Sequence, residues 1–211
     1  MEPTSKARIL KKIRSALVNT VPQPYPELEG NTKDCYYYPH HDLPILFAEQ
    51  FTALGGKFTF CQNKSDLYHQ LKSLIQMQNW TEVICWEEPL LNDLIFNSIP
   101  AITHKKEMEQ AQAAITYCEK LIARTGTILL SSKQEAGRTL GAFAPVHIVI
   151  ATISQIIQDI KDATLFIKTN YGLKLPSMLC FTTGPSRTAD IEKTLVVGVH
   201  GPKEIYVFLL E

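Results

Sequence analysis

Short apolar runs alternate with helical patterns through most of this 211-residue chain, and this alternation constrains its fold more than any other feature. The runs KFTFC (57–61), EVICW (82–86) and PVHIVIA (145–151) have the length and composition of buried strands. Between the first two, residues 64–80 carry apolar side chains at helical spacing. Strands that alternate with helices predict an α/β fold with a largely parallel sheet covered by helices on both faces.

Other segments extend the pattern. FAEQFTALGG (47–56) is expected to form a helix that ends at its two glycines, because glycine accepts the left-handed cap conformation. Thr152 and Gln155 form a capping box ahead of apolar residues at helical spacing, which predicts a helix from residue 152. The runs TGTILLSS, PSMLCFT and EIYVFLL predict strands over 125–132, 176–182 and 204–210.

The first 44 residues differ in character from the rest. Ile9, Ile13 and Leu17 fall on one face of a short amphipathic helix. Prolines at 22, 24, 26, 39 and 44 then argue against a continuing helix and indicate an extended arm. We therefore expect an N-terminal helix with a proline-rich arm over 1–44, and a single α/β domain over 45–211.

The charge balance gives no reason to expect a polyanionic partner. The chain has 21 Lys and Arg residues against 21 Asp and Glu, a formal net charge of zero. Neither nucleic acid nor an anionic membrane is therefore an expected ligand. The N-terminus lacks the apolar core of a signal peptide, and no stretch reaches the ~18 apolar residues of a membrane span. We expect a cytoplasmic protein.

The cysteines do not indicate a metal centre. They are scattered at positions 35, 61, 85, 118 and 180, and none forms a C-x-x-C pair. Iron–sulfur and zinc sites need clustered ligands. His40 and His41 are adjacent, and neighbouring side chains rarely converge on one ion. We expect reduced thiols, with no metal and no cofactor.

The segment TTGPSRTADIE (182–192) concentrates hydrogen-bonding groups at a predicted strand-to-helix corner. Gly184 permits a sharp turn or a close approach by a ligand. Ser186 or Thr188 can cap the following helix, whose remaining first-turn N–H groups favour an anion, and both are candidate ligand-binding residues. Arg187 can add a two-pronged contact to a carboxylate or a phosphate. One interpretation of this segment is therefore an anion-binding corner.

The alternative is a purely structural corner. Thr188 serves equally well as the helix cap, and Arg187 can pair with Asp190 or Glu192 on the same helix. The residues of this segment alone do not separate the two interpretations.

A second corner has a similar composition. Thr125, Gly126 and Thr127 precede a predicted strand, and the loop after that strand contains Gly137 and Arg138. Such residues build little core but can present backbone amides and a guanidinium to a ligand. Neither corner matches a P-loop or the G-x-G-x-x-G fingerprint, so nucleotide binding in those modes is not expected.

Parallel topology places successive strand-end loops at one edge of the sheet. We therefore expect the two corners to share one cleft at the carboxyl ends of the strands, with a small anionic ligand between Arg138 and Arg187. His147 lies inside an apolar run and is expected to be a hydrogen-bonded core residue. The candidate acid–base residues are Asp190, Glu192 and His200.

Several of these motifs resemble the LUD-domain family, of the lactate-utilisation C-subunit type. TGT, GR, PVHIVI, GPSRTADIE and GVHGP occur in this order across residues 125–210. The resemblance implies the fold of the superfamily that includes glucosamine-phosphate deaminase, ribose-phosphate isomerase and the CoA-transferases. It also implies a role in oxidising L-lactate to pyruvate alongside separate iron–sulfur subunits.

One position departs from the family pattern. The family commonly has an acidic residue before TGT, where this chain has Arg124. The exchange removes a carboxylate that could act as a base or nucleophile. It leaves Glu135, Asp190 and Glu192 as the carboxylates near the motifs, and adds positive charge beside the expected anion site.

Three functional hypotheses follow. The first is an accessory subunit for the oxidation of lactate or a related organic acid, acting with iron–sulfur partners. The second is a free-standing enzyme that acts on a phosphorylated or CoA-linked acid. The third is a ligand-sensing domain without chemistry. Each is compatible with a homo-oligomer.

The scattered cysteines generate a first prediction. Protein purified without oxygen is expected to contain no stoichiometric iron or acid-labile sulfide, and to show no visible absorption bands. Colorimetric iron and sulfide assays, calibrated on a known iron–sulfur protein, check this. One cluster per chain would show that the spacing argument fails.

Overall fold

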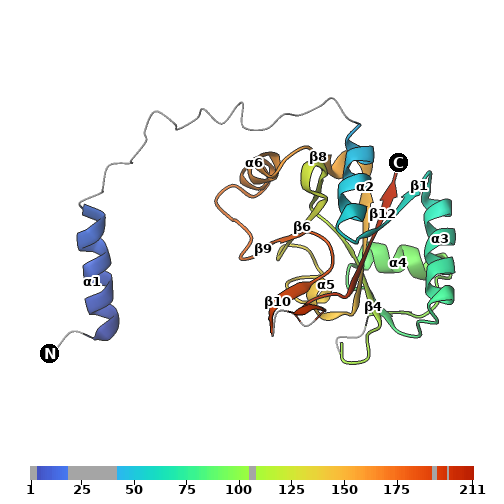
Figure 1. Cartoon of the computed structure of the whole chain (residues 1–211), viewed down its shortest axis with the longest axis horizontal. Coiled ribbons are helices and arrows are strands. Elements are labelled where there is room, and N and C mark those ends of the chain that lie inside the picture. Colours follow the sequence, from blue (N-terminus) through green and yellow to red (C-terminus); the bar gives the residue numbers. More distant parts are fainter. Residues whose placement is uncertain (1–3, 19–41, 105–107, 192–193, 199) are drawn as a thin grey trace. The chain divides into compact units, whose positions relative to one another are not determined.

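The computed structural model describes residues 4–18, 42–104, 108–191, 194–198 and 200–211 (Figure 1). The chain divides into two compact units, residues 1–40 and 41–211. Within the first unit, helix α1 (Ser5–Val18) has the predicted amphipathic pattern and buries none of its residues. The proline-rich arm up to residue 41, with His40 and His41, lies outside the described residues.

A six-stranded, fully parallel sheet forms the centre of the second unit, which confirms the predicted α/β class. Its strand order is β1-β12-β7-β4-β2-β3. The strands are β1 (Lys57–Cys61), β2 (Val83–Ile84), β3 (Ile102–Thr103), β4 (Ala113–Tyr117), β7 (Val146–Thr152) and β12 (Glu204–Leu210).

One face of this sheet is covered by α3 (Lys64–Met77) and α4 (Glu88–Phe96). Both helices bury apolar stripes at helical spacing, for example Leu67 and Leu71 on α3. These residues pack against the β12 side chains Tyr206 and Phe208. The N-terminus of α3 is fixed by Asn63, whose Oδ1 accepts a hydrogen bond from the Asp66 backbone N–H at 3.0 Å.

The other face is covered by α2 (Leu43–Ala53) and by a second, smaller sheet. This second sheet has the order β8-β5-β6-β9. Its strands are β5 (Lys120–Ile122), β6 (Thr127–Ser131), β8 (Ile156–Ile157) and β9 (Leu179–Thr182). Helix α6 (Ile160–Tyr171) packs on its outer side, and α5 (Leu140–Phe143) packs on β4 through Leu140 and Ala114.

Two predicted helices are corrected. The capping box at Thr152 is present, with Gln155 Oε1 accepting from the Thr152 backbone N–H at 2.9 Å. It starts only the 3₁₀ turn Ile153–Gln155, because the next two residues pair with β5 as strand β8. Likewise β10 (Arg187–Ile191) and β11 (Thr194–Val197) form an antiparallel pair where we expected a helix after residue 186.

No helix among the described residues is long and apolar enough to cross a membrane.

Gly126 generates a second prediction. It adopts a φ of +58°, and a Cβ at this position would lie 2.5 Å from the Phe51 backbone nitrogen of α2. Gly137 has a similar φ of +63°, but a Cβ there would meet only the Glu135 carbonyl oxygen, at 3.8 Å. We expect Gly126→Ala to lower the free energy of unfolding by about 3 kcal/mol or more, and Gly137→Ala by about 1 kcal/mol. Urea denaturation measures both, and equal losses would contradict the packing argument.

Candidate ligand-binding site

A pocket of about 280 Å³ lies between the second sheet and the segments that lead into β7 and β12. It brings together the loop before α5, one side of β9, the corner after β9 and the turn before β12. The lining residues are Leu130, Gly137, Arg138, Gly141, Ala142, Met178, Cys180, Phe181, Thr182, Gly184, Ser186, His200, Gly201 and Pro202.

The two sequence corners therefore line one pocket, but its position differs from the expected one. The segments 200–202 and 141–142 come before β12 and β7, so the pocket lies at the amino ends of these strands. The Lys203 backbone N–H donates to the Pro145 carbonyl at 2.7 Å and holds the two approaches side by side. The expected position at the carboxyl ends of the central strands was wrong, because these lining segments lead into β7 and β12 rather than out of them.

Arg138 supplies the positive charge of the pocket. Its Nη2 donates to Ser177 Oγ at 2.5 Å, which ties the guanidinium to the residue before Met178 and β9. The remaining N–H groups of the guanidinium form a fork suited to a carboxylate. No acidic residue occurs among the described residues that line this pocket. The polar side chains of the lining include the Arg138 guanidinium, the His200 imidazole and the Ser186 hydroxyl.

The corner after β9 is held by backbone contacts. The Ser186 N–H donates to the Pro202 carbonyl at 2.9 Å, and the Gly198 N–H donates to the Ser186 carbonyl at 3.0 Å. Gly184 has a φ of +76°, and a Cβ on it would lie 2.9 Å from the Leu54 carbonyl oxygen. Glycine is therefore required here by its backbone conformation and by a close approach to α2.

Arg187 does not line this pocket. Its Nη2 donates to the Leu54 carbonyl at 2.8 Å, one of the orphan carbonyls at the end of α2. The structure thus separates Arg187 from Arg138, and only Arg138 is in a position to contact a ligand in the pocket. Residues 187–191 form strand β10 rather than the expected helix, and Arg187 at its start bonds to the end of α2.

The TGT motif does not line the pocket, but it contacts the corner after β9, which does. Thr127 Oγ1 contacts Thr125 Oγ1 at 2.7 Å and Thr183 Oγ1 at 2.8 Å, and Gly126 packs on α2. The motif therefore anchors the corner after β9 to the sheet. The side chains of Thr188 and Asp190 lie outside the described part of the structure, as does all of Glu192.

Arg124, the departure from the family pattern, is neutralised locally. Its Nε lies 2.6 Å from Asp159 Oδ2 and its Nη2 lies 3.2 Å from Oδ1. The Asp159 side chain is only 11% exposed and also caps α6. The charge at position 124 is therefore used to hold α6 rather than to attract a ligand.

His147 lies beneath the pocket. It is fully buried on β7, and its Nε2 lies 2.9 Å from Thr116 Oγ1. Burial lowers the pKa of His147 to about 4, so the ring is neutral at physiological pH. A Cβ on Gly141 would lie 2.8 Å from the ring, so the ring packs directly against the backbone of α5. His147 is a core residue, as predicted, although its Nδ1 has no hydrogen-bond partner among the described residues.

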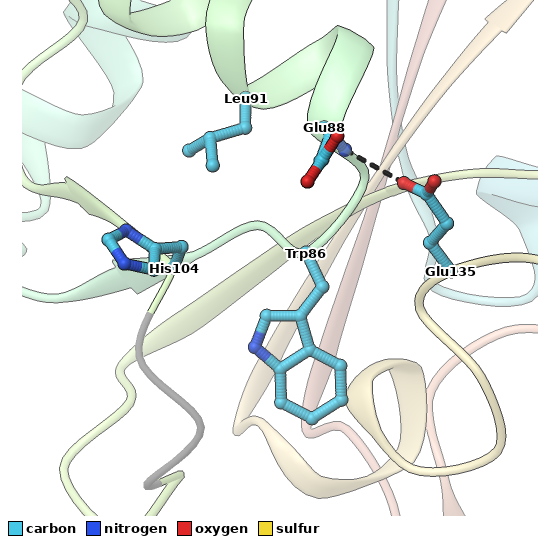
Figure 2. Close-up of a pocket in the computed structure, with 5 residues that line it drawn as sticks. All are labelled: Trp86, Glu88, Leu91, His104 and Glu135. Atoms are coloured by element: carbon cyan, nitrogen blue, oxygen red, sulfur yellow. Dashed lines mark hydrogen bonds between the residues drawn. The ribbon is translucent and has the colours of Figure 1, made fainter.

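A second cavity, of about 420 Å³, lies at the carboxyl ends of β2 and β3 (Figure 2). Trp86, Leu91 and His104 line it together with two carboxylates. Glu135 Oε2 accepts a hydrogen bond from the Glu88 backbone N–H at 2.8 Å (Figure 2). Glu135 thus caps the first turn of α4, and this accounts for one carboxylate left as a candidate by the sequence.

Glu87, which the sequence analysis missed, is a buried carboxylate beside that cavity. It is 4% exposed, and its Oε2 accepts from the Tyr117 backbone N–H at 2.5 Å across the ends of β2 and β4. The chain leaves these two strands toward opposite faces of the sheet, which defines a topological switch point. Burial, and secondarily the nearby charge of Glu135, raise the pKa of Glu87 to about 7, although the Tyr117 N–H opposes the shift.

A third cavity, of about 460 Å³, adjoins the Arg138 pocket. The two cavities share Ala142, His200 and Gly201, and the third one also contacts Lys203. A basic side chain therefore stands on each side of the shared wall.

The fold and the pocket together define an α/β protein with a mildly basic, glycine-lined site between two sheets. The LUD domain family matches residues 46–210, and the chain belongs to this family. A crystal structure of a DUF162 family protein from Deinococcus radiodurans has the same fold, with a TM-score of 0.57 and 19% identity. That match covers 80% of this chain and 96% of the other.

Curated relatives bear one name. The chain is 31% identical over 180 residues to lactate utilization protein C of Shouchella clausii, covering 79% of this chain and 78% of that protein. It is 39% identical over 107 residues to the Bacillus subtilis protein of the same name, covering 49% of this chain and 45% of the relative. In that second alignment the chain spans less than half of the relative.

Glu87 generates a third prediction. Its raised pKa means that the folded protein holds a proton that the unfolded chain releases, so stability falls as the pH rises from about 4.5 to about 7. We expect Glu87→Gln to match the parent near pH 5 and to exceed it at pH 8, by on the order of 3 kcal/mol. Denaturation at both pH values measures the difference. Glu49→Gln, at an exposed position of α2, is the control. A difference between Glu87→Gln and the parent that does not change with pH would contradict the burial argument.

Proposed function

We propose that this chain is the organic-acid-binding component of a lactate-utilisation system and acts with iron–sulfur partner subunits. The observation that carries the proposal is the convergence of Arg138, Ser186 and His200 on one pocket whose described lining contains no carboxylate. The shared name of the curated relatives supplies the system and the substrate class.

A 2-hydroxy acid fits the chemistry of these groups. Its carboxylate accepts paired hydrogen bonds from the Arg138 guanidinium, the geometry in which arginine exceeds lysine. Another N–H group of the same guanidinium can donate to the 2-hydroxyl, and Ser186 and His200 offer polar contacts toward the other end of the pocket. Oxidation to the 2-oxo acid removes two electrons and two protons. In our proposal the partner subunits take the electrons, while this chain binds and orients the acid.

A second candidate function is supported by the cavity beside Lys203. It adjoins the Arg138 pocket, so a longer ligand with a second anionic group could extend across His200. That arrangement suits an enzyme acting on a phosphorylated or CoA-linked acid. Turnover of CoA thioesters by the isolated chain, abolished by Lys203→Ala, would favour this function over the first.

Arg138 generates the fourth prediction. We expect L-lactate to raise the melting temperature of the parent, and Arg138→Ala to weaken lactate binding by about 10- to 100-fold, the loss of a charge-assisted hydrogen bond. Calorimetric titration measures the affinity. Lys72→Ala, which removes an exposed cation on α3, is the matched control and should bind like the parent. Equal affinity in all three proteins would remove Arg138 from the site.

A further inference from the structure

The pocket around Arg138 has the shape of a groove along one side of β9. Side chains two residues apart on a strand point to the same face, and Met178, Cys180 and Thr182 all line the pocket. Cys180 Sγ lies 3.4 Å from Thr182 Oγ1, which confirms that their side chains share this face. At ~3.3 Å per residue, the groove floor from Met178 to Thr182 is about 13 Å long.

Polar groups stand toward the ends of this groove and apolar groups between them. Arg138 is tied to Ser177, immediately before Met178, which places the guanidinium toward the start of the floor. Ser186 and the turn that contains His200 lie beyond Thr182, toward the other end. Between them, the middle of the groove has mainly apolar walls, formed by Leu130, Ala142 and Cys180.

Lactate alone leaves most of this space unfilled. A lactate ion occupies roughly the volume of four water molecules, ~120 Å³, against about 280 Å³ for the pocket. If its carboxylate contacts Arg138, its methyl group reaches only the first part of the floor. An inorganic phosphate is still shorter and offers nothing to the apolar walls.

We propose that the groove selects an extended 2-hydroxy or 2-oxo monocarboxylic acid, with its carboxylate on Arg138 and a hydrocarbon chain along Met178 and Cys180. This inference rests on the proposed function and narrows its substrate class. The flexible thioether of Met178 adapts to hydrocarbon chains of different shape. The groove therefore selects an apolar chain rather than a chain of one particular shape. The far end of the chain meets Ser186 and His200, which bounds the length.

The test is a series in which only the hydrocarbon chain changes. Lactate, 2-hydroxybutyrate, 2-hydroxyhexanoate and 2-hydroxyoctanoate are titrated calorimetrically into the parent protein, with inorganic phosphate as the reference anion. Each buried methylene strengthens binding roughly fourfold. We expect at least a tenfold gain from lactate to 2-hydroxyhexanoate, and no displacement of the bound acid by phosphate.

Two variants locate the gain. Met178→Gln keeps the length of the side chain but makes it polar, and is expected to reduce the gain, measured relative to lactate in the same variant, to less than threefold. Leu165→Ser removes an exposed leucine of α6 outside the groove and is the control. A lowered melting temperature would show that Met178→Gln folds poorly. In that case Leu130→Met, which keeps the groove apolar, is measured instead and must retain the full gain.

The outcomes separate this inference from the proposed function. An affinity that stays flat along the series, with lactate still bound, overturns the extended substrate and leaves the proposed function standing. Absence of binding by every acid overturns the proposed function itself. A gain that survives Met178→Gln places the chain elsewhere and also overturns the groove assignment.

Discussion

The parallel pairing of β12 with β1 on one side and β7 on the other is the interaction on which the rest of the structure depends. Its side chains alternate between the two cores: Ile205, Val207 and Leu209 pack toward α2 and the second sheet, and Tyr206 and Phe208 pack toward α3 and α4. Strand β12 thus contacts both layers. Its register with β7 fixes where the segments before these two strands lie, and those segments line the Arg138 pocket.

The pocket shows how small residues can define a site without forming its chemistry. Thr125–Thr127 and Arg187 hold the corner after β9 from behind, through Thr183 and Leu54. In the proposed site the charged contact to the ligand is made by Arg138, on a loop of the opposite wall. Membership of a sequence motif near the pocket therefore does not mean that a residue lines the pocket. Arg187 belongs to such a motif and does not line the pocket, whereas Arg138 does.

The α/β class followed from the sequence because strand and helix periodicities are local properties. The location of the pocket did not, since it depends on which loops the tertiary structure brings together, and no local pattern records that arrangement. A helix was expected to begin after residue 186, because Ser186 and Thr188 resemble helix caps; pairing of β10 with β11 overrode the local preference. Glu87 gave no signal at all, because only its tertiary burial distinguishes it from the exposed glutamate that follows.

The central position of β12 also has a consequence for biosynthesis. Lys57 of β1 forms a hydrogen bond with Glu204 of β12, which is synthesised 147 residues later. At the usual elongation rates this interval lasts roughly 7 to 30 s. Throughout that time β1 lacks its neighbour, as β7 does from its own synthesis onward, and their open edges can pair with other nascent chains. The assembly of this protein in cells is therefore expected to depend on chaperones that shield strand edges until translation passes residue 210.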